Sequence, residues 1–419
     1  MKRKVLVLCD DPTKTSGVGC QARHLIEGLV KTGHWSFRCL GGAIRHENYD
    51  VKVINDDFIV KPVDGFGTPE LLRNCLVTEK PDAVFLFTDP RFFTWVWEME
   101  DEVHQICPIV YWHVWDNDPF PRFNDVLYRS TDLINCHSYL TYTLLKDEYP
   151  DKVNFVPHAI PQDMFFPITR EEAMQQRVRL IGADRRDHFV CIRVNRNARR
   201  KMPGNVMLAW KLFLDKLEQE HGHRDATLVM HTHPHDPEGQ NLPVIAEQLE
   251  IGRNVVYSAE RVNFSDMNVL YNVADFALNI AAHEGFGMAT LEAMQCGLPI
   301  IALKTGGLTR QVVDHRDGSE NGFALEPEVR DLVGGQTVPY IYEDHIAPAT
   351  VAASIMSMYE LGSTGRNELG SKARAYVLSE FDHATTVALW NKTMGDAIDM
   401  WKRSDDKDAG RKQWEVVTL

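Results

Sequence analysis

Short apolar runs alternate with amphipathic stretches over most of this chain, and the alternation comes in two series. In the first series the apolar runs cover residues 5–8, 83–87, 109–112 and 133–136. In the second series they cover residues 189–192, 227–230, 255–257, 276–280 and 300–303. Short apolar runs between helical patterns are typical of buried strands in parallel sheets that carry helices on both faces. The sequence therefore predicts an α/β protein with two doubly wound, Rossmann-like domains.

Three prolines between residues 157 and 167 interrupt the pattern and indicate a domain boundary. We predict a first domain over residues 1–165, a second over 166–380 and a helical C-terminal segment over 381–419. The stretch from about 326 to 348 is poorly periodic, which favours an insertion or a long loop. Open parallel sheets bind ligands outside the carboxyl ends of their strands. We therefore expect the binding site to lie between the two domains.

The composition is that of a globular protein, with 44% hydrophobic and 25% charged residues among 419. A formal net charge of −14 gives no general attraction to nucleic acid or to anionic membranes. No apolar run approaches the roughly 18 residues that span a bilayer, and the first residues lack the apolar core of a signal peptide. The eight cysteines are scattered without a Cys-x-x-Cys pair, which favours reduced thiols. We therefore expect a cytoplasmic protein without integral membrane contact.

The segment from His283 to Met294 is the most informative motif. It follows the apolar run 276–280, carries two glycines and continues into a helical pattern. Glycine lets a ligand approach the backbone, and a helix N-terminus favours an anion such as phosphate. Glu292 follows Glu284 by eight residues and should lie about two turns into the helix. Two acids beside an anion site suit hydroxyl groups on either side of it, as in a nucleotide diphosphate sugar; alternatively, both are surface acids at a helix start.

A basic pair follows the first expected strand of the second domain. Arg196 and Lys201 would stabilise a departing diphosphate if they lie beside it. An ordinary solvated basic face is the alternative. In the first domain, a turn containing Gly17 and Gly19 follows the first expected strand.

These motifs, in this order, resemble those of GT-B glycosyltransferases of the retaining family-4 type, the glycosyl transferases group 1. The resemblance covers nearly the whole chain. Four elements carry it: Glu284-x7-Glu292 followed by 297–299, Arg196-x4-Lys201, the glycine turn at 17–19, and the segment 156–167, where His158 and Ala159 replace the usual Asn-Gly.

The resemblance implies transfer of a sugar from a UDP-, GDP- or ADP-sugar to an acceptor hydroxyl, with the anomeric configuration retained. It implies no metal and no other cofactor, and a C-terminal helix that crosses back to the first domain. The catalytic residues that it implies are His113, Glu284, Arg196 and Lys201. The donor-binding residues that it implies are Gly17, Gly19, Gly285, Phe286, Gly287, Met288 and Glu292, with Glu284 on the sugar hydroxyls and Glu292 on the ribose.

Two further motifs imitate metal sites. Residues 116–118, Asp-Asn-Asp, have the form of the Asp-x-Asp site of the other large glycosyltransferase fold, and we interpret Asp116 and Asp118 as loop or acceptor residues. The run 231–236 contains three alternating histidines and an aspartate, a pattern that suits zinc. Because Pro234 restricts the fold of this run, we predict no metal there.

Alternative functions use the same cleft. A GT-B sugar-nucleotide epimerase needs no acceptor, and a non-catalytic sugar-nucleotide-binding protein would need a defective site. The acceptor is left open among a glycan, a small molecule, a protein and a modified nucleic-acid base. Lipid-acceptor members usually carry a basic amphipathic helix in the first domain, whereas residues 98–102 are acidic here, which favours a soluble acceptor. The oligomeric state is not predicted.

Overall fold

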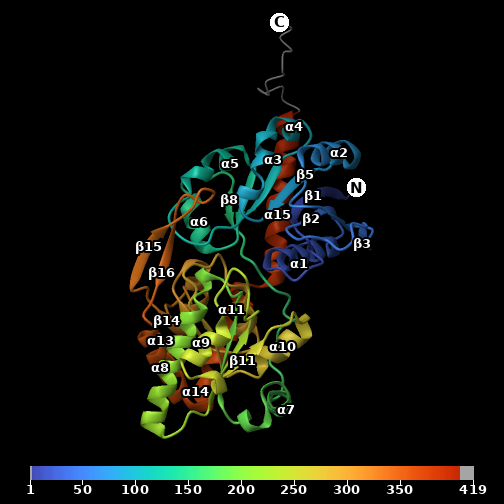
Figure 1. Cartoon of the computed structure of the whole chain (residues 1–419). Helices are drawn as coiled ribbons and strands as arrows, with labels where there is room; N and C mark the ends of the chain where they lie inside the picture. The colour runs from blue at the N-terminus through green and yellow to red at the C-terminus, as the bar shows by residue number, and fades with distance from the viewer. Residues whose placement is uncertain (1, 406–419) are drawn as a thin grey trace.

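The structure, a computed structural model, describes residues 2–405 and contains two large sheets, one in each half of the molecule (Figure 1). The part of the predicted C-terminal segment beyond residue 405 lies outside the described residues, as does Met1. The predicted α/β fold with two Rossmann-like sheets is confirmed. The exact domain boundaries at residues 165 and 380 stay a proposal.

The first sheet has eight strands in the order β3-β4-β2-β1-β5-β6-β7-β8. Its strands are β1 (Arg3–Asp10), β2 (Trp35–Gly42), β3 (Lys52–Asn55), β4 (Phe58–Pro62), β5 (Ala83–Phe87), β6 (Ile109–His113), β7 (Leu133–Cys136) and β8 (Val153–Phe155). Its helices are α1 (Gly17–Lys31), α2 (Pro69–Glu79), α3 (Thr94–Glu98), α4 (Glu100–His104), α5 (Asp125–Ser130) and α6 (Tyr139–Leu145), with 3-10 turns η1 (Pro90–Phe92) and η2 (Arg122–Asn124). All neighbours pair in parallel except β3 with β4, which is antiparallel.

The second sheet has six parallel strands in the order β11-β10-β9-β12-β13-β14. Its strands are β9 (Phe189–Val194), β10 (Ala226–His231), β11 (Val255–Ser258), β12 (Phe276–Asn279), β13 (Ile300–Leu303) and β14 (Gly322–Leu325). Its helices are α7 (Arg170–Ile181), α8 (Pro203–His221), α9 (Leu242–Gln248), α10 (Phe264–Asn272), α11 (Met288–Gln295), α12 (Thr309–Val312), α13 (Pro348–Glu360) and α14 (Gly362–Glu380). The 3-10 turns are η3 (Ala183–Arg185), η4 (Arg199–Lys201), η5 (Gly252–Asn254) and η6 (Gly306–Leu308).

Both faces of each sheet are buried, as continuous apolar strands require. Successive side chains of a strand point to opposite faces. In β1, Val5 and Val7 therefore join one hydrophobic core, while Leu6 and Leu8 join another. The second sheet is divided in the same way between two cores. Because the carboxyl ends of the parallel strands lie at one edge of each sheet, residues that follow β1, β5, β6, β9 and β12 line a common space between the two sheets.

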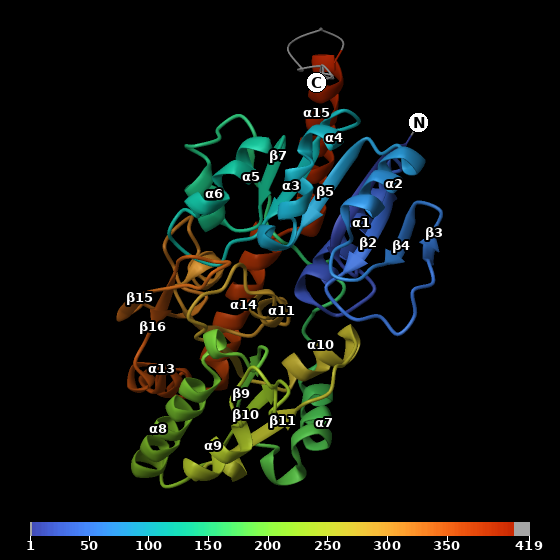
Figure 2. The same ribbon diagram turned by 45° about the horizontal axis from the view of Figure 1, so that its top comes forward.

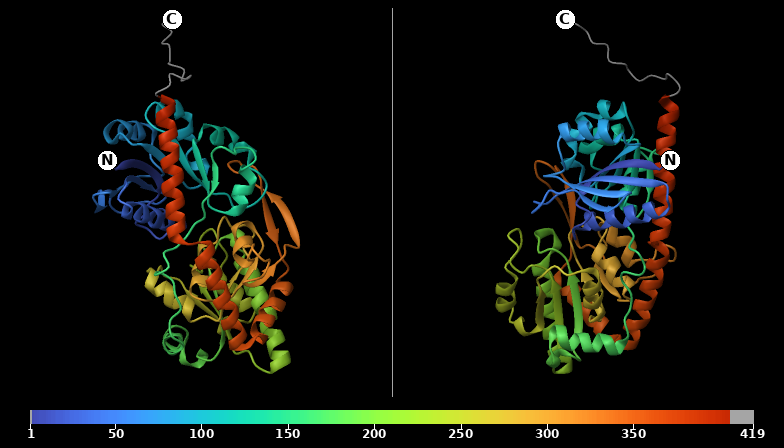
Figure 3. Two further views of the ribbon diagram at one scale, coloured as in Figure 1. Left: turned by 180° about the vertical axis from the view of Figure 1, so that it is seen from behind. Right: turned by 90° about the vertical axis from the view of Figure 1, so that its right-hand side faces the viewer.

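The long helix α15 (His383–Asp405) connects the two domains at the back of the molecule (Figure 3). The preceding helix, α14, buries Tyr376 and Val377 in a core of the second domain. The chain then turns at Phe381, and α15 buries Trp390 and Met394 in the core that contains β1 of the first domain. The expected helix that crosses back to the first domain is thus confirmed.

Residues 326–348 form an antiparallel hairpin, β15 (Val329–Val333) and β16 (Ile341–His345), rather than an irregular loop. Of the two readings of this stretch, an insertion or a long loop, the structure contradicts the long loop. The strand gave no periodic signal because β15 is largely exposed. A strand without a buried face shows no apolar alternation. The hairpin reaches the first domain (Figures 1 and 2).

Among the helices that the structure describes, none is both long and apolar enough to cross a membrane. All eight cysteines lie within residues 2–405 and are free.

Candidate active site

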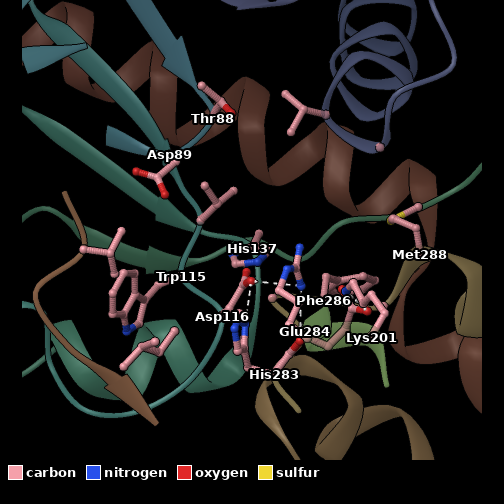
Figure 4. A pocket seen from close by; sticks show the side chains of 18 of the residues that line it. Thr88, Asp89, Trp115, Asp116, His137, Lys201, His283, Glu284, Phe286 and Met288 are labelled. Atoms are coloured by element: carbon pink, nitrogen blue, oxygen red, sulfur yellow. Dashed lines mark hydrogen bonds and ion pairs between the residues drawn. The ribbon is translucent and has the colours of Figure 1, made fainter. Parts of the chain in front are cut away.

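A central cavity of about 820 Å³ lies between the two sheets at the carboxyl ends of their strands (Figure 4). The first domain contributes residues that follow β1, β5, β6 and β7. The second domain contributes residues that follow β9 and β12, together with the start of α11. From these elements the cavity is lined by Asp10, Gly17, Thr88, Asp89, Trp115, Asp116, His137, Asn195, Lys201, His283, Glu284, Gly285, Phe286, Gly287 and Met288, among others.

The motif at 283–294 folds as the sequence predicted, with a strand end, a turn and a helix start. Gly287 has φ of +93°, a left-handed conformation that favours glycine, and it begins α11. Within the described chain no side chain caps the N-terminus of this helix. The helix start, whose N–H groups and dipole favour an anion, thus lies at the cavity wall.

A second glycine pair, Gly306 and Gly307 in η6, supports this turn, and the sequence analysis did not identify it. A Cβ at Gly306 would lie 2.1 Å from the carbonyl oxygen of Glu284 and 2.3 Å from that of Asp116. The backbone N–H of Gly307 donates to the Glu284 carbonyl at 2.9 Å. The Gly-Gly pair shortly after strand β13 was the available sequence signal.

Lys201 and Glu284 form an ion pair of 2.5 Å between Nζ and Oε2 inside the cavity. The side chains are 8% and 15% exposed, so the pair is largely removed from water. Burial lowers the pKa of the Lys201 ammonium, and the neighbouring Glu284 opposes this effect. Below the pair, the buried Arg193 donates from Nη2 to the Lys201 carbonyl at 2.7 Å. Arg193 is another positioning residue that the sequence analysis missed.

The structure separates Arg196 from Lys201. The Arg196 side chain is 58% exposed and bonds Asp236 at 2.8 Å and Glu238 at 3.1 Å. It lines a neighbouring side pocket of about 730 Å³ rather than the central cavity. The predicted basic pair is thus divided between two compartments, because Lys201 lies in η4 and turns back toward Glu284.

The side pocket adjoins the central cavity, since both are lined by Gly17, Asn195, Met288 and Ala289. Glu292 lies at its wall, in the second turn of α11. Burial raises the pKa of the Glu292 carboxyl to about 7, although the Tyr271 hydroxyl donates to it at 2.6 Å and lowers it in part. Glu284 and Glu292 therefore face two adjoining compartments.

Of the two glycines in the turn after β1, one faces the cavities. Gly17 lines both, and a Cβ built on it would meet open space. Gly19 does not stand in the lining; its N–H donates to the hydroxyl of Ser16, the N-cap of α1, at 3.0 Å. A Cβ at Gly19 would lie 2.7 Å from the Asp11 carbonyl oxygen. The structure thus gives Gly19 a place in the cap of α1, and its donor-binding role stays a prediction.

His113, the predicted active-site histidine, is not among the residues that line the cavity. Its side chain is fully buried, and Nε2 is 2.6 Å from the Tyr128 hydroxyl. His137, directly after β7, lines the cavity instead, and its Nδ1 donates to the His113 carbonyl at 2.7 Å. This bond leaves the Nε2 lone pair beside Gly285, where a Cβ would lie 2.8 Å from Nε2. Burial lowers the pKa of His137 to about 4, so its ring is neutral at pH 7.

Asp116 connects the two domains across the cavity (Figure 4). Its Oδ2 lies 2.9 Å from Nδ1 of His283 and 3.3 Å from Nη1 of Arg200. Burial opposes ionisation of Asp116, but Arg200, His283 and Lys201 together hold its pKa well below the ordinary value. Arg199, the neighbour of Arg200, pairs with Glu343 of the hairpin at 2.8 Å.

Among residues 2–405, no group of three or more His, Cys, Asp or Glu side chains is arranged to hold a metal ion. In the run 231–236, His231 Nδ1 is hydrogen-bonded to the Ser258 hydroxyl at 2.9 Å, and the Asp236 carboxylate accepts a hydrogen bond from Arg196.

Solved structures identify the class of fold. The chain is similar to sucrose-phosphate synthase from Thermosynechococcus elongatus, with a TM-score of 0.71, 15% identity and coverage of 96% of this chain and 100% of that one. It is also similar to Anabaena HepE in complex with UDP-glucose, with a TM-score of 0.66, 16% identity and coverage of 94% and 99%. The E. coli trehalose-6-phosphate enzyme bound with UDP-2-fluoro glucose gives a TM-score of 0.63 at 12% identity, with coverage of 94% and 99%. The protein therefore has the GT-B fold.

Sequence comparison matches part of the chain to a known family. Residues 176–335 match the family described as glycosyl transferases group 1, and with this match the resemblance to that family is confirmed. D-inositol 3-phosphate glycosyltransferase from Corynebacterium jeikeium is 34% identical over 87 residues, which are 21% of this chain and 20% of that protein. N-acetyl-alpha-D-glucosaminyl L-malate synthase from Bacillus anthracis is 26% identical over 124 residues, 30% of this chain and 31% of that protein. The matches thus span less than a third of each of these two relatives.

Proposed function

We propose that this protein is a retaining glycosyltransferase that moves a sugar from a nucleotide diphosphate sugar to an acceptor hydroxyl. The observation that carries the proposal is the Lys201–Glu284 ion pair at the uncapped start of α11, in a cavity that adjoins a pocket containing Glu292. The sugar occupies the central cavity with Glu284, the diphosphate lies between Gly17 and the start of α11, and the nucleoside occupies the side pocket.

In the proposed reaction, the bond between the anomeric carbon and the diphosphate oxygen breaks, and a bond from that carbon to the acceptor oxygen forms on the same face. The acceptor proton passes to the departing diphosphate. Negative charge that develops on the diphosphate is stabilised by Lys201 and by backbone N–H groups at the start of α11, which are already oriented. Arg196 reaches the nucleotide side of the diphosphate from the side pocket.

UDP-glucose is the first donor to test. Two of the similar structures are described in complex with UDP-glucose or a fluorinated analogue of it. GDP- and ADP-sugars are the comparison donors, and a thermal-shift screen separates the three. We expect the preferred nucleotide sugar to raise the unfolding temperature of the wild type, and Glu292→Ala to abolish the increase. If all three donors raise the unfolding temperature equally, in the wild type and in the variant, the placement of the nucleoside is contradicted.

The reaction is proposed to need no metal and no other cofactor. Lys201 and the helix dipole would supply the positive charge that a divalent ion supplies in other enzymes. Turnover that persists in EDTA supports this, whereas turnover that is lost in EDTA and restored by Mg²⁺ or Mn²⁺ contradicts it.

The acceptor is proposed to be a soluble hydroxyl compound. The protein is proposed to be cytoplasmic because its eight cysteines are free. None of the relatives and structures named above is described as an epimerase or as an enzyme that modifies nucleic-acid bases. An epimerised nucleotide sugar formed without acceptor would reverse this choice.

A further inference from the structure

The β15–β16 hairpin pairs with neither of the two large sheets, yet it is anchored at its base. The carboxylate of Asp344, fully buried, accepts from Nδ2 of Asn117 at 2.7 Å, from the hydroxyl of Thr305 at 2.7 Å and from Nε of Arg330 at 2.6 Å. Asn117 belongs to the loop after β6 in the first domain. The base of a hairpin from the second domain is thus bonded to the first domain through a buried carboxylate.

The same loop of the first domain continues along the hairpin. The backbone N–H of Tyr342 donates to the Asp118 carbonyl at 2.8 Å. Farther out, the Tyr340 hydroxyl accepts from the Arg122 backbone N–H at 2.9 Å, and its ring packs edge-on against Phe123 at 5.2 Å. The hairpin therefore lies along residues 117–123 (Figures 1 and 2), and the domains meet here as well as at α15.

The inner side of the hairpin forms a wall of the central cavity. The lining residues at and beside its tip are all uncharged: Val333, Gly334, Gly335, Thr337, Val338 and Ile341. The first domain contributes a second wall of the cavity, with Thr88, Asp89, Arg91, Phe92 and Trp115. Leu332, in contrast, is 64% exposed and is not among the lining residues.

The charges of the cavity disfavour an anionic acceptor. Its lining has four cations and five carboxylates, counting histidines as neutral. Each cation already has a carboxylate partner: Arg91 with Asp89 at 3.5 Å, Arg199 with Glu343, Arg200 with Asp116, and Lys201 with Glu284. The fifth carboxylate, Asp10, accepts from the Ser16 hydroxyl at 2.7 Å. When the donor is bound, its diphosphate also interacts with Lys201. A phosphate or carboxylate on the acceptor would therefore be repelled by the negative charges of the cavity and would meet no unpaired cation among the lining residues.

We infer that the β15–β16 hairpin is the acceptor-selecting wall of the cleft, and that it admits an uncharged sugar or polyol. The inference rests on the proposed glycosyl transfer. Between the two walls a hydroxyl-rich molecule meets the Asp89 carboxylate, the Thr88 and Thr337 hydroxyls and the backbone at Gly334. Aromatic and aliphatic side chains offer contact for the apolar face of a sugar ring. The same wall keeps bulk water from the bound donor.

The first test uses water as the acceptor, because the natural acceptor is not known. In full-length protein, residues 334–340 are replaced by Asn-Gly, a two-residue hairpin turn that keeps Val333 paired with Ile341. UDP release from UDP-glucose is measured without added acceptor, together with the Kd for UDP-glucose. We expect hydrolysis to rise about fivefold or more while the Kd changes by less than about twofold. Unchanged hydrolysis with a normal Kd would overturn the inference.

The second test uses two point variants of the same hairpin and does not depend on the shortened turn. Val338→Trp fills the cavity from the tip, and Leu332→Trp adds the same ring on the exposed side as the control. Acceptor-dependent UDP release is followed with glycerol and glucose and with their phosphates, glycerol 3-phosphate and glucose 6-phosphate. We expect the uncharged member of each pair to be preferred, and only Val338→Trp to reduce its use, by about tenfold. Preference for the phosphorylated members, or equal rates in the two variants, would contradict the inference.

Failure of the inference is distinguishable from failure of the proposed function. If wild-type protein neither binds nor hydrolyses any nucleotide sugar, the proposed function fails. If it binds and hydrolyses UDP-glucose but the hairpin variants behave as wild type, the hairpin has no selecting role and the proposed function stands. Thermal unfolding of each variant shows whether it is folded.

Discussion

Asp116 of the first domain and His283 of the second share a hydrogen bond of 2.9 Å across the central cavity, beside the residue, Glu284, that we place on the donor sugar. The bond lies where the two domains must approach each other for water to be excluded from the reaction. The Asp116 carboxylate also forms an ion pair with Arg200. One side chain therefore couples the position of the loop after β6 to that of the donor-binding turn.

Asp116→Asn should weaken this coupling. The amide cannot neutralise Arg200, and we expect a loss of about 1 kcal/mol in the free energy of unfolding, because the site is partly screened by solvent. The KM for the donor should also rise. Denaturant unfolding and donor kinetics measure the two effects. Asp118→Asn, two residues along the same loop, loses only a 3.6 Å contact with Arg330 and serves as the control. Equal effects of the two substitutions would refute the coupling.

The carboxyl of Glu292 should make both stability and donor affinity depend on pH. Its pKa is raised by burial to about 7, above the ordinary value of 4.5 that applies in the unfolded chain. The unfolded state therefore loses this proton first, and the free energy of unfolding should fall by roughly 1–3 kcal/mol as pH rises from about 4.5 to about 7.

In the folded protein the Glu292 carboxylate, which would accept from ribose hydroxyls, forms as pH rises through about 7, so the donor Kd should improve around that pH. Glu292→Gln should remove both trends. Unfolding and donor binding measured between pH 4 and pH 9 test the expectation. If the stability of the wild type and that of Glu292→Gln change with pH in the same way, Glu292 is not the titrating group.

The two histidines at the ends of β6 and β7 should separate stability from activity. His113→Phe removes the hydrogen bond to the Tyr128 hydroxyl in a buried place and should cost about 1–2 kcal/mol of stability with little change in kcat. His137→Gln keeps a donor for the His113 carbonyl but removes the imidazole from the cavity, and should lower kcat by about tenfold to a hundredfold. Reversed effects in unfolding and kinetic assays would restore His113 as the active-site histidine.

Gly306→Ala should disturb the donor turn. Its φ is +48°, and the added methyl group would meet the backbone of Glu284 and Asp116 at little more than 2 Å. We expect a loss of about 2 kcal/mol or more in stability, with weaker donor binding. Gly252→Ala is the matched control, because its Cβ would meet no heavy atom of the described residues within 4 Å. Differential scanning fluorimetry with and without donor reads both effects; a normal donor response in Gly306→Ala would show that the turn tolerates the methyl group.

The sequence was sufficient to predict the elements whose signal is local. The strand before Glu284 and the helix that carries Glu292 follow from apolar periodicity and glycine placement, and these positions agree with the structure. The partners of a charged residue are not local. Arg196 is held by Asp236, forty residues away, so its separation from Lys201 could not be predicted from the spacing Arg-x4-Lys. The hairpin escaped prediction for another reason, since β15 has no buried face to give a period.

The most direct test of the central claim is the consumption of UDP-glucose, with the anomeric configuration of the product, by wild-type protein and by Glu284→Gln in the presence of EDTA. We expect the wild type to release UDP and to form an α-linked product. Glu284→Gln should stay folded but react roughly a hundredfold to a thousandfold more slowly. In this variant Lys201 lacks its ion-pair partner, and the donor sugar lacks the carboxylate that accepts from its hydroxyls. An inverted product, or a Glu284→Gln variant as fast as the wild type, would contradict the account.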